Sequence, residues 1–165
     1  MLFRSWAQMC LEGTTVFGSG GHGAHAKYMK VPVSTLVPLP DELSFEVGAA
    51  ISCGTGTAYG ALRRLSLHGD ETIAIFGQGP VGLSATQLAV AMGARVIALD
   101  TSPERRELAK EFGAHEVIGP ESNDPVDAIR ELTHGEGAHK TLDCSSAPSA
   151  RRAAVQAARS WGTAC

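Results

Sequence analysis

One short segment constrains this chain more than any other, the glycine-rich turn Gly77-Gln78-Gly79-Pro80-Val81-Gly82. The turn follows a uniformly apolar stretch, residues 73–76, and opens a stretch whose apolar residues recur at the helical repeat. Three glycines between a strand and a helix are typical of folds that bind dinucleotides. The first glycine allows the tight bend, the second lets a diphosphate approach the backbone, and the third lets the helix pack on the strand. The amides that begin the helix would face the phosphates.

An acidic partner for the turn stands at Asp100, which ends the next apolar stretch, residues 96–99. A carboxylate there can accept hydrogen bonds from both hydroxyls of an adenosine ribose, and it would repel the extra phosphate of NADP. These features predict NAD rather than NADP as the cofactor. Arg105, one helical turn further on, could contact the ribose or a phosphate. Two alternatives stay open: a purely structural turn, and an S-adenosylmethionine-binding domain, which the third glycine and the helix spacing fit less well.

From residue 69 onward, strand-like apolar stretches alternate with amphipathic helical stretches. Capping residues and prolines begin these helices, and glycines end them. This rhythm predicts right-handed crossovers and a parallel sheet, so the expected fold class is α/β, with an incomplete Rossmann-type doubly wound sheet. The expected strands are 73–76, 96–100, 117–118 and 140–144, followed by a helix over 148–160 and a strand that begins at 162–165.

The part before the sheet has a different character. Residues 28–33 alternate weakly, as in an antiparallel strand. Ser44 can cap a helix that is interrupted in the Gly54–Gly56 region and resumes over 59–65. We therefore expect two domains, over residues 1–43 and 44–165.

Composition excludes several classes of partner. A formal net charge of −3 provides no basic surface for nucleic acid or an anionic membrane. No stretch is long and apolar enough to cross a bilayer. The cysteines, Cys10, Cys53, Cys144 and Cys165, lie far apart without a disulfide pattern. We expect a cytoplasmic protein with reduced thiols and with no nucleic-acid or membrane partner.

Cysteine and histidine spacing alone does not predict a metal site. Cys53 lies among small residues, where a cysteine is more often a buried small hydrophobe than a ligand. No Cys-x-x-Cys or His-x-x-x-His pair accompanies it, whereas zinc requires three or four ligands. His22 and His25 lie in a glycine-rich stretch, where surface histidines are more common than ligands.

Several stretches together resemble the medium-chain, zinc-dependent alcohol dehydrogenases, a family that includes alcohol, sorbitol and threonine dehydrogenases. The resemblance extends over nearly the whole chain and is far more specific than the glycine turn alone. It is carried by residues 21–32, 36–41, 53–59, 76–82 and 91–100.

The resemblance implies roles for individual residues. Thr57 matches the position that contacts the nicotinamide, and the turn 77–82 matches the pyrophosphate loop. Asp100 and Arg105 match the ribose-binding acid and its basic companion.

Two cysteines acquire a metal role by the same resemblance. Cys53 matches the third ligand of the family's catalytic zinc. Cys10 resembles the last cysteine of the lobe that holds a structural zinc. A thiolate is a favoured zinc ligand, which suits both assignments.

The chain also departs from the family pattern. Family members begin with a longer GroES-like catalytic domain, which carries the first zinc cysteine, a Gly-His-Glu segment with the second ligand, and the proton-relay hydroxyl. None of these occurs here, and the sheet stops as its fifth strand begins. We interpret the chain as a fragment or a truncated reading frame, a remnant of the GroES-like β domain followed by an NAD-binding domain.

For the complete parent, the resemblance implies a homo-oligomer that reversibly oxidises an alcohol or polyol with NAD and zinc. One cysteine cannot hold a catalytic zinc, so we expect these 165 residues alone to lack that activity. Two alternatives remain: a zinc-independent, NADPH-dependent quinone or enoyl reductase of the same superfamily, and a non-catalytic dinucleotide-binding module. The substrate is not indicated, because the residues that shape its pocket lie mostly outside this sequence.

Overall fold

The structure is a computed structural model of the chain, and it describes residues 13, 15–119 and 124–165. The chain divides into two units, Met1–Ser44 and Phe45–Cys165. Within the described residues of the first unit, regular structure is limited to a bridge between Phe17 and Gly21 and a 3₁₀ turn, Val33–Thr35.

The strand expected over residues 28–33 is therefore wrong. Met29 and Val33, on the apolar side of the alternation, are 37% and 83% exposed, so that side covers no core. Pro32 contributes no amide donor, and its carbonyl instead accepts from the amide of Thr35 in the 3₁₀ turn. The GroES-like remnant stays a prediction.

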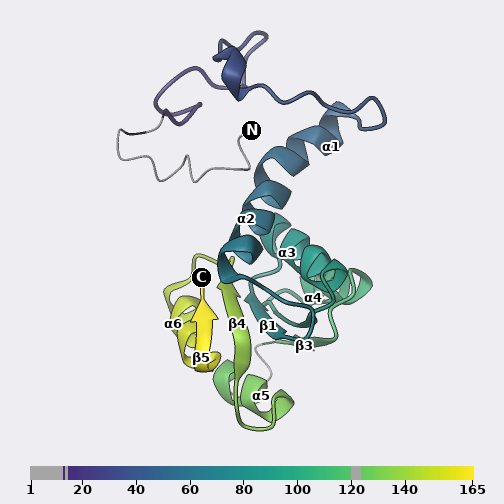
Figure 1. The fold of residues 1–165 in the computed structure, drawn as a ribbon, viewed down its shortest axis with the longest axis vertical. Coiled ribbons are helices and arrows are strands. Elements are labelled where there is room, and N and C mark those ends of the chain that lie inside the picture. The colour runs from purple at the N-terminus through teal and green to yellow at the C-terminus, as the bar shows by residue number, and fades with distance from the viewer. Residues whose placement is uncertain (1–12, 14, 120–123) are drawn as a thin grey trace. The chain divides into compact units, whose positions relative to one another are not determined.

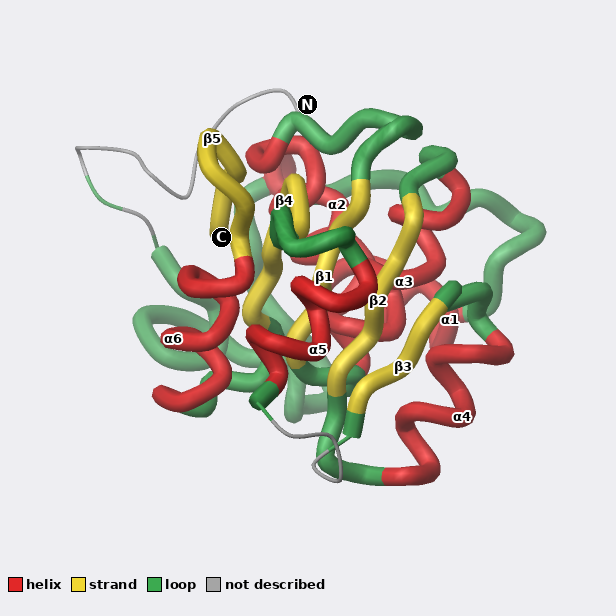
Figure 2. Tube along the Cα trace, turned by 90° about the horizontal axis from the view of Figure 1, so that it is seen from below, coloured by secondary structure: helices red, strands yellow, loops and turns green. Residues whose placement is uncertain are grey.

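The second unit contains one parallel sheet with the strand order β3-β2-β1-β4-β5 (Figure 1, Figure 2). Each strand is followed or preceded by a helix, as crossovers between parallel strands require, and the predicted α/β class is confirmed. The strands are β1 (Thr72–Phe76), β2 (Arg95–Leu99), β3 (Glu116–Ile118), β4 (Ala138–Asp143) and β5 (Ala158–Ala164). The crossover helices are α3 (Pro80–Ala91), α4 (Pro103–Glu111), α5 (Pro125–Leu132) and α6 (Pro148–Ala157).

Two apolar clusters cover the two faces of this sheet. Helices α2 (Gly56–Leu65) and α3 pack on the face that carries Ile73 and Ile75 of β1. Helices α5 and α6 pack on the opposite face, which carries Ala74 and Phe76. Because both faces are covered, β1 has no polar side, which explains its uniformly apolar sequence.

The helix before the sheet is continuous, which corrects the interruption expected near Gly54–Gly56. Helix α1 (Phe45–Ala50) passes into a π-helical turn, Ile51–Thr55, and then into α2 without a break. A glycine lowers the stability of a helix but does not prevent one from forming. Here the helix adopts a wider, π-helical turn and then continues.

The boundary between α6 and β5 also differs from the expected one. Helix α6 ends at Ala157 rather than at residue 160, and β5 begins at once. Ala158 pairs with Ala138 and Thr163 pairs with Lys140, so the segment between these pairs bulges. Trp161 in this bulge has a φ of 62° and a fully exposed side chain. A bulge interrupts the period-2 pattern, so the sequence shows only the last part of the strand.

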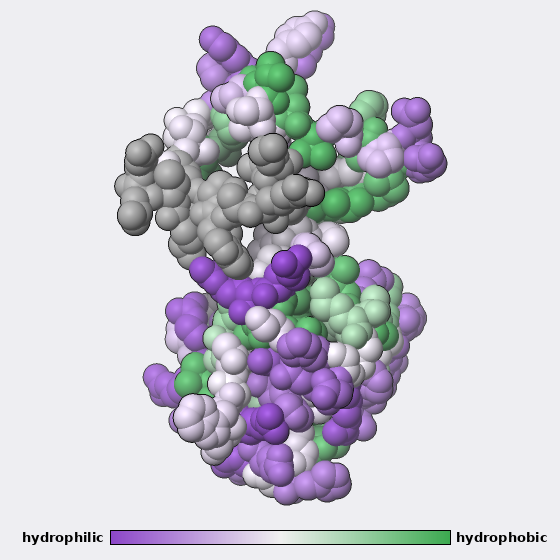
Figure 3. Space-filling model, in the orientation of Figure 1, coloured by the Kyte–Doolittle hydropathy of each residue, from purple (hydrophilic) through white to green (hydrophobic). Residues whose placement is uncertain are grey.

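The five-stranded unit presents mostly hydrophilic residues on the side that Figure 3 shows. Within the described ranges, no helix combines the length and the apolar character needed to cross a bilayer.

Thr141 of β4 provides a stability test, because it is fully buried and its hydroxyl has no hydrogen-bond partner in the described part of the chain. Thr141→Val keeps the shape and removes the unpaired hydroxyl. We expect the free energy of unfolding to rise by about 1 kcal/mol, measured by urea denaturation. The control Thr141→Ser keeps the hydroxyl and loses a methyl group, so its midpoint should fall. A lower midpoint for Thr141→Val would contradict this expectation.

Candidate dinucleotide-binding site

The glycine turn joins β1 to α3, and two of its glycines are required by close packing. Gly77 has a φ of +88°, and a Cβ there would lie 2.9 Å from the backbone of Ser145. A Cβ on Gly82 would overlap the carbonyl oxygen of Gly77. The first and third glycines thus let the start of α3 lie directly against the end of β1.

Gly79 is different, because neither its conformation nor its neighbours require glycine. Its φ of −74° and ψ of −170° are open to other residues, and a Cβ there would meet nothing within 4 Å. The space beside Gly79 is therefore open, as expected where a ligand approaches the backbone.

The amides around this open space are available to a ligand. Pro80 is the first residue of α3 and has no N–H, and the ladder of the helix begins with the amide of Leu83 donating to the carbonyl of Gly79. Within the described part of the chain, we find no acceptor for the amides of Gly79, Val81 and Gly82. Unpaired amides at the positive end of a helix dipole form an anion site that suits a diphosphate.

Asp100 lies beside the turn and holds it to the end of β2. Its Oδ2 accepts a hydrogen bond from the amide of Gln78 at 2.6 Å, and its Oδ1 accepts from the amide of Ser102 at 2.8 Å. The side chain is only 5% exposed. A carboxylate offers about four lone-pair sites, so two remain for ribose hydroxyls.

Arg105 lies at the outer edge of this group. Its Nη1 is 3.8 Å from Oδ2 of Asp100, and its side chain is 56% exposed. Because the Arg105 side chain is more than half exposed and the two atoms are 3.8 Å apart, this ion pair contributes little to stability. Because more than half of its side chain is exposed, Arg105 is accessible to a ribose or a phosphate.

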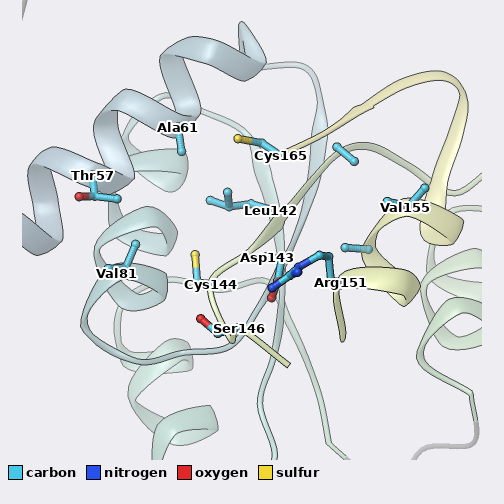
Figure 4. Close-up of a pocket in the computed structure, with 12 residues that line it drawn as sticks. Thr57, Ala61, Val81, Leu142, Asp143, Cys144, Ser146, Arg151, Val155 and Cys165 are labelled. Carbon is cyan, nitrogen blue, oxygen red and sulfur yellow. The ribbon is translucent and has the colours of Figure 1, made fainter. Parts of the chain in front are cut away.

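A cavity of about 510 Å³ adjoins the turn, and Val81 belongs to both. Figure 4 shows Thr57 of α2 and Val81 of α3 on one side of the cavity, with Arg151 and Val155 of α6 on the other. Most of its wall is apolar, with a few polar groups, which is the usual character of a small-molecule site. The lining also includes Ala61, Leu142, Asp143, Cys144, Ser146, Ala154, Ala164 and Cys165.

Asp143 organises the polar edge of the cavity. Its Oδ1 accepts hydrogen bonds from the amide and the hydroxyl of Ser145, at 2.9 and 2.6 Å. Its Oδ2 lies 3.5 Å from Nε of Arg151. These contacts fix the loop after β4, in which Ser146 adopts a left-handed φ of 61° and lines the cavity.

Cys144 contributes a neutral wall rather than a nucleophile. Burial raises the pKa of its thiol to about 12, with smaller contributions from Asp143 and Cys165. The thiol therefore stays protonated at neutral pH, and a protonated thiol is a poor nucleophile and a poor metal ligand.

Cys53 lies in the π-helical turn close to the start of α3. It is exposed, which corrects the expectation of a buried small hydrophobe that its neighbours alone suggested. A Cβ on Gly54 would lie 3.7 Å from the carbonyl oxygen of Pro80, and the hydroxyls of Thr55 and Ser84 are 3.3 Å apart. The structure thus brings the segment that holds Cys53 and Thr57 against the helix that follows the glycine turn.

The described residues do not complete a metal site. Among them, no group of three or more His, Cys, Asp or Glu side chains could hold a metal ion. His22 and His25 are exposed. Cys10 lies outside the described residues.

Gln78 behaves differently from the other turn residues. Its side chain is fully buried, Nε2 donates to the carbonyl of Ile75 at 3.0 Å, and Oε1 accepts from the hydroxyl of Thr86 at 2.9 Å. Because its main-chain amide donates to Asp100, Gln78 has no donor left for a ligand. Thr86, Asp143 and Ser146 were not predicted from the sequence, and no spacing rule indicates the contact between Gln78 and Thr86, because Gln78 lies before α3.

Comparisons with known proteins agree with this geometry. The sequence model of the family described as zinc-binding dehydrogenase matches residues 80–165. The chain is 42% identical over 154 residues to the uncharacterized zinc-type alcohol dehydrogenase-like protein YphC of Escherichia coli strain K12, covering 92% of this chain and 43% of that protein.

Solved structures show the same relationship. The alcohol dehydrogenase TADH from Thermus sp. ATN1 is 34% identical with a TM-score of 0.80, over 86% of this chain and 42% of that chain. A quinone oxidoreductase from Pseudomonas syringae pv. Tomato DC3000 is 31% identical with a TM-score of 0.74, over 81% of this chain and 42% of that chain.

The parallel sheet and its flanking helices define a Rossmann-like α/β fold. The chain belongs to the zinc-binding dehydrogenase family, within the medium-chain group that its sequence motifs indicated. It spans less than half the length of the curated relatives it matches, for example 43% of YphC.

The raised pKa of Cys144 can be tested by the rate at which its thiol is alkylated. At pH 8 we expect iodoacetamide to modify Cys144 roughly 100-fold more slowly than the exposed Cys53, because the thiolate is the reactive form. Peptide mapping by mass spectrometry follows each thiol separately. Similar rates for Cys144 and Cys53 in the folded protein would disprove the assignment, and both should react rapidly in urea.

Proposed function

We propose that this chain supplies the NAD-binding domain of an oxidoreductase that transfers a hydride between an alcohol or polyol and NAD. One observation carries the proposal: the open space at Gly79 is bordered by amides for which the described residues supply no acceptor, and it lies beside the carboxylate of Asp100. The zinc-type alcohol dehydrogenase-like relative and the alcohol dehydrogenase structure support the reaction class.

The diphosphate and the adenosine ribose each have a counterpart among the described residues. The amides of Gly79, Val81 and Gly82 would hold the diphosphate, and Asp100 would accept from the adenosine ribose. The same carboxylate disfavours the additional phosphate of NADP by charge repulsion.

The cavity beside the turn fits the nicotinamide end. Thr57 offers a hydroxyl to orient the ring, while Val81 and Leu142 provide apolar walls that exclude water. When bound, the nicotinamide supplies the hydride acceptor or donor, and the protein supplies its position and surroundings.

The residues present do not by themselves fit a zinc ion. A catalytic zinc requires three protein ligands and an open position, and among the described residues no group of three His, Cys, Asp or Glu side chains could hold a metal ion, at Cys53 or elsewhere. Zinc assistance is therefore proposed only for the whole protein, in which Cys53 would supply one thiolate.

A second candidate is a zinc-independent, NADPH-dependent reductase of quinones or enoyl compounds. The similarity to the quinone oxidoreductase structure favours it. Cofactor preference separates the two candidates, because the second requires tighter binding of the phosphorylated cofactor.

Calorimetric titration of the 165-residue chain with NAD and with NADP tests the proposed function. We expect heat from NAD and at least about tenfold weaker binding of NADP, since Asp100 faces the position of the extra phosphate. We also expect no turnover of ethanol or sorbitol with NAD by this chain. Tighter binding of NADP would support the reductase instead, and no heat from either cofactor would reject both.

Two glycine variants distinguish a glycine that leaves space for the ligand from a glycine that close packing requires. Gly79→Ala should keep the free energy of unfolding, since its Cβ meets no protein atom, and should weaken NAD binding at least about tenfold. Gly82→Ala should lower the free energy of unfolding by about 2–3 kcal/mol, since its Cβ overlaps the Gly77 carbonyl. Urea denaturation and calorimetry measure the two effects. Unchanged NAD affinity in Gly79→Ala would place the diphosphate elsewhere.

A further inference from the structure

A buried polar pair lies directly beneath the glycine turn. Gln78 and Thr86 are both fully buried, and they are joined by a hydrogen bond of 2.9 Å from the Thr86 hydroxyl to Oε1 of Gln78. Burying two polar side chains among apolar ones costs free energy unless they satisfy each other, and here they do. Neither side chain reaches the open space at Gly79, so neither can touch a ligand there.

The pair connects three elements at one residue. Nε2 of Gln78 donates to the carbonyl of Ile75 in β1, and Oε1 accepts from Thr86, which lies on the second turn of α3. The main-chain amide of the same residue donates to Asp100 after β2. Gln78 is therefore fixed from both its side chain and its main chain, between Gly77 and Gly79.

The restraint on Gln78 matters because its two neighbours are glycines, the residues with the most flexible backbone. Gly77 and Gly79 flank Gln78, and each can adopt many backbone conformations when nothing restrains it. A binding site that is already ordered before the ligand arrives loses less entropy on binding. Restraint of residue 78 thereby restrains the amides that follow it.

We propose that Gln78 and Thr86 are positioning residues that hold the amides of Gly79, Val81 and Gly82 in the direction required by a diphosphate. The inference rests on the proposed function, since its ligand is the diphosphate of NAD. Thr86 is a residue of the helix whose first amides form the site, so the pair fixes the helix axis and the turn together.

A set of four variants separates positioning from stability. Thr86→Val and Gln78→Met each remove one partner and keep the approximate shape. The double variant removes both the Thr86 hydroxyl and the Gln78 amide, and with them the hydrogen bond from Nε2 to the carbonyl of Ile75. Thr86→Ser keeps the hydroxyl. Thr141→Val serves as the matched control, because Thr141 is an equally buried threonine outside the turn.

Stability and affinity should respond differently across this set. Thr86→Val leaves Oε1 of Gln78 buried without a donor, so the urea midpoint should fall by about 1 M. The double variant should recover most of that midpoint, because replacing both partners by apolar groups is nearly neutral. Its dissociation constant for NAD should nevertheless stay about tenfold higher than that of the wild type. Thr86→Ser and Thr141→Val should bind NAD within about twofold of the wild type.

Amide hydrogen exchange in the free protein provides a second measurement that needs no ligand. In the double variant the amides of Gln78 and Leu83, which donate to Asp100 and to the carbonyl of Gly79, should exchange at least about tenfold faster than in the wild type, while amides of β1 should be unchanged.

The outcomes distinguish the two proposals. If the wild type binds NAD and the double variant binds it equally well with unchanged exchange, the pair is only structural and the inference is wrong. If the wild type binds no NAD, the proposed function is wrong. Faster exchange in the double variant would then still support the positioning role for the turn itself, and unchanged exchange would overturn it as well.

Discussion

The contact between Gly82 and the carbonyl of Gly77 is the constraint on which the rest of the site depends. Without a side chain at residue 82, the first turn of α3 lies directly against the end of β1. The amide of Gly77 donates to the carbonyl of Leu99, and the carbonyl of Phe76 accepts from the amide of Cys144, so the end of β1 is held between β2 and β4. The helix amides are thereby directed at the carboxyl edge of a parallel sheet, where α/β folds bind their ligands.

Around this contact, three strand ends supply different chemistry. The end of β1 supplies amides, the end of β2 supplies the carboxylate of Asp100, and the end of β4 supplies the polar edge of the cavity through Asp143. Each carboxylate accepts amide hydrogen bonds from its own loop, Ser102 for one and Ser145 for the other. Each carboxylate therefore orders its own loop and keeps further lone pairs that can accept hydrogen bonds from a ligand. The loops are thus ordered before the ligand binds.

Local patterns predicted the sheet and the turn well, because each depends on a few neighbouring residues. Sequence patterns alone identify the apolar run of β1, the glycine spacing and Asp100. The bulge in β5 was not readable, since it depends on the register against Ala138 and Lys140. The inward direction of Gln78 was also hidden, because its partner Thr86 is identified only when the axis of α3 is known. The exposure of Cys53 was also not predictable, because its small neighbours do not show which side of the helix is covered.

Nuclear magnetic resonance of the ¹⁵N-labelled chain, titrated with NAD, tests the central claim most directly, because it reports on each backbone amide separately. The proposed site predicts that the largest shifts fall on the amides of Gly79, Val81 and Gly82, with smaller changes at Thr57 and around Asp100. A response to NAD that leaves these three amides unmoved, while other parts of the sheet or the first unit shift, would contradict it.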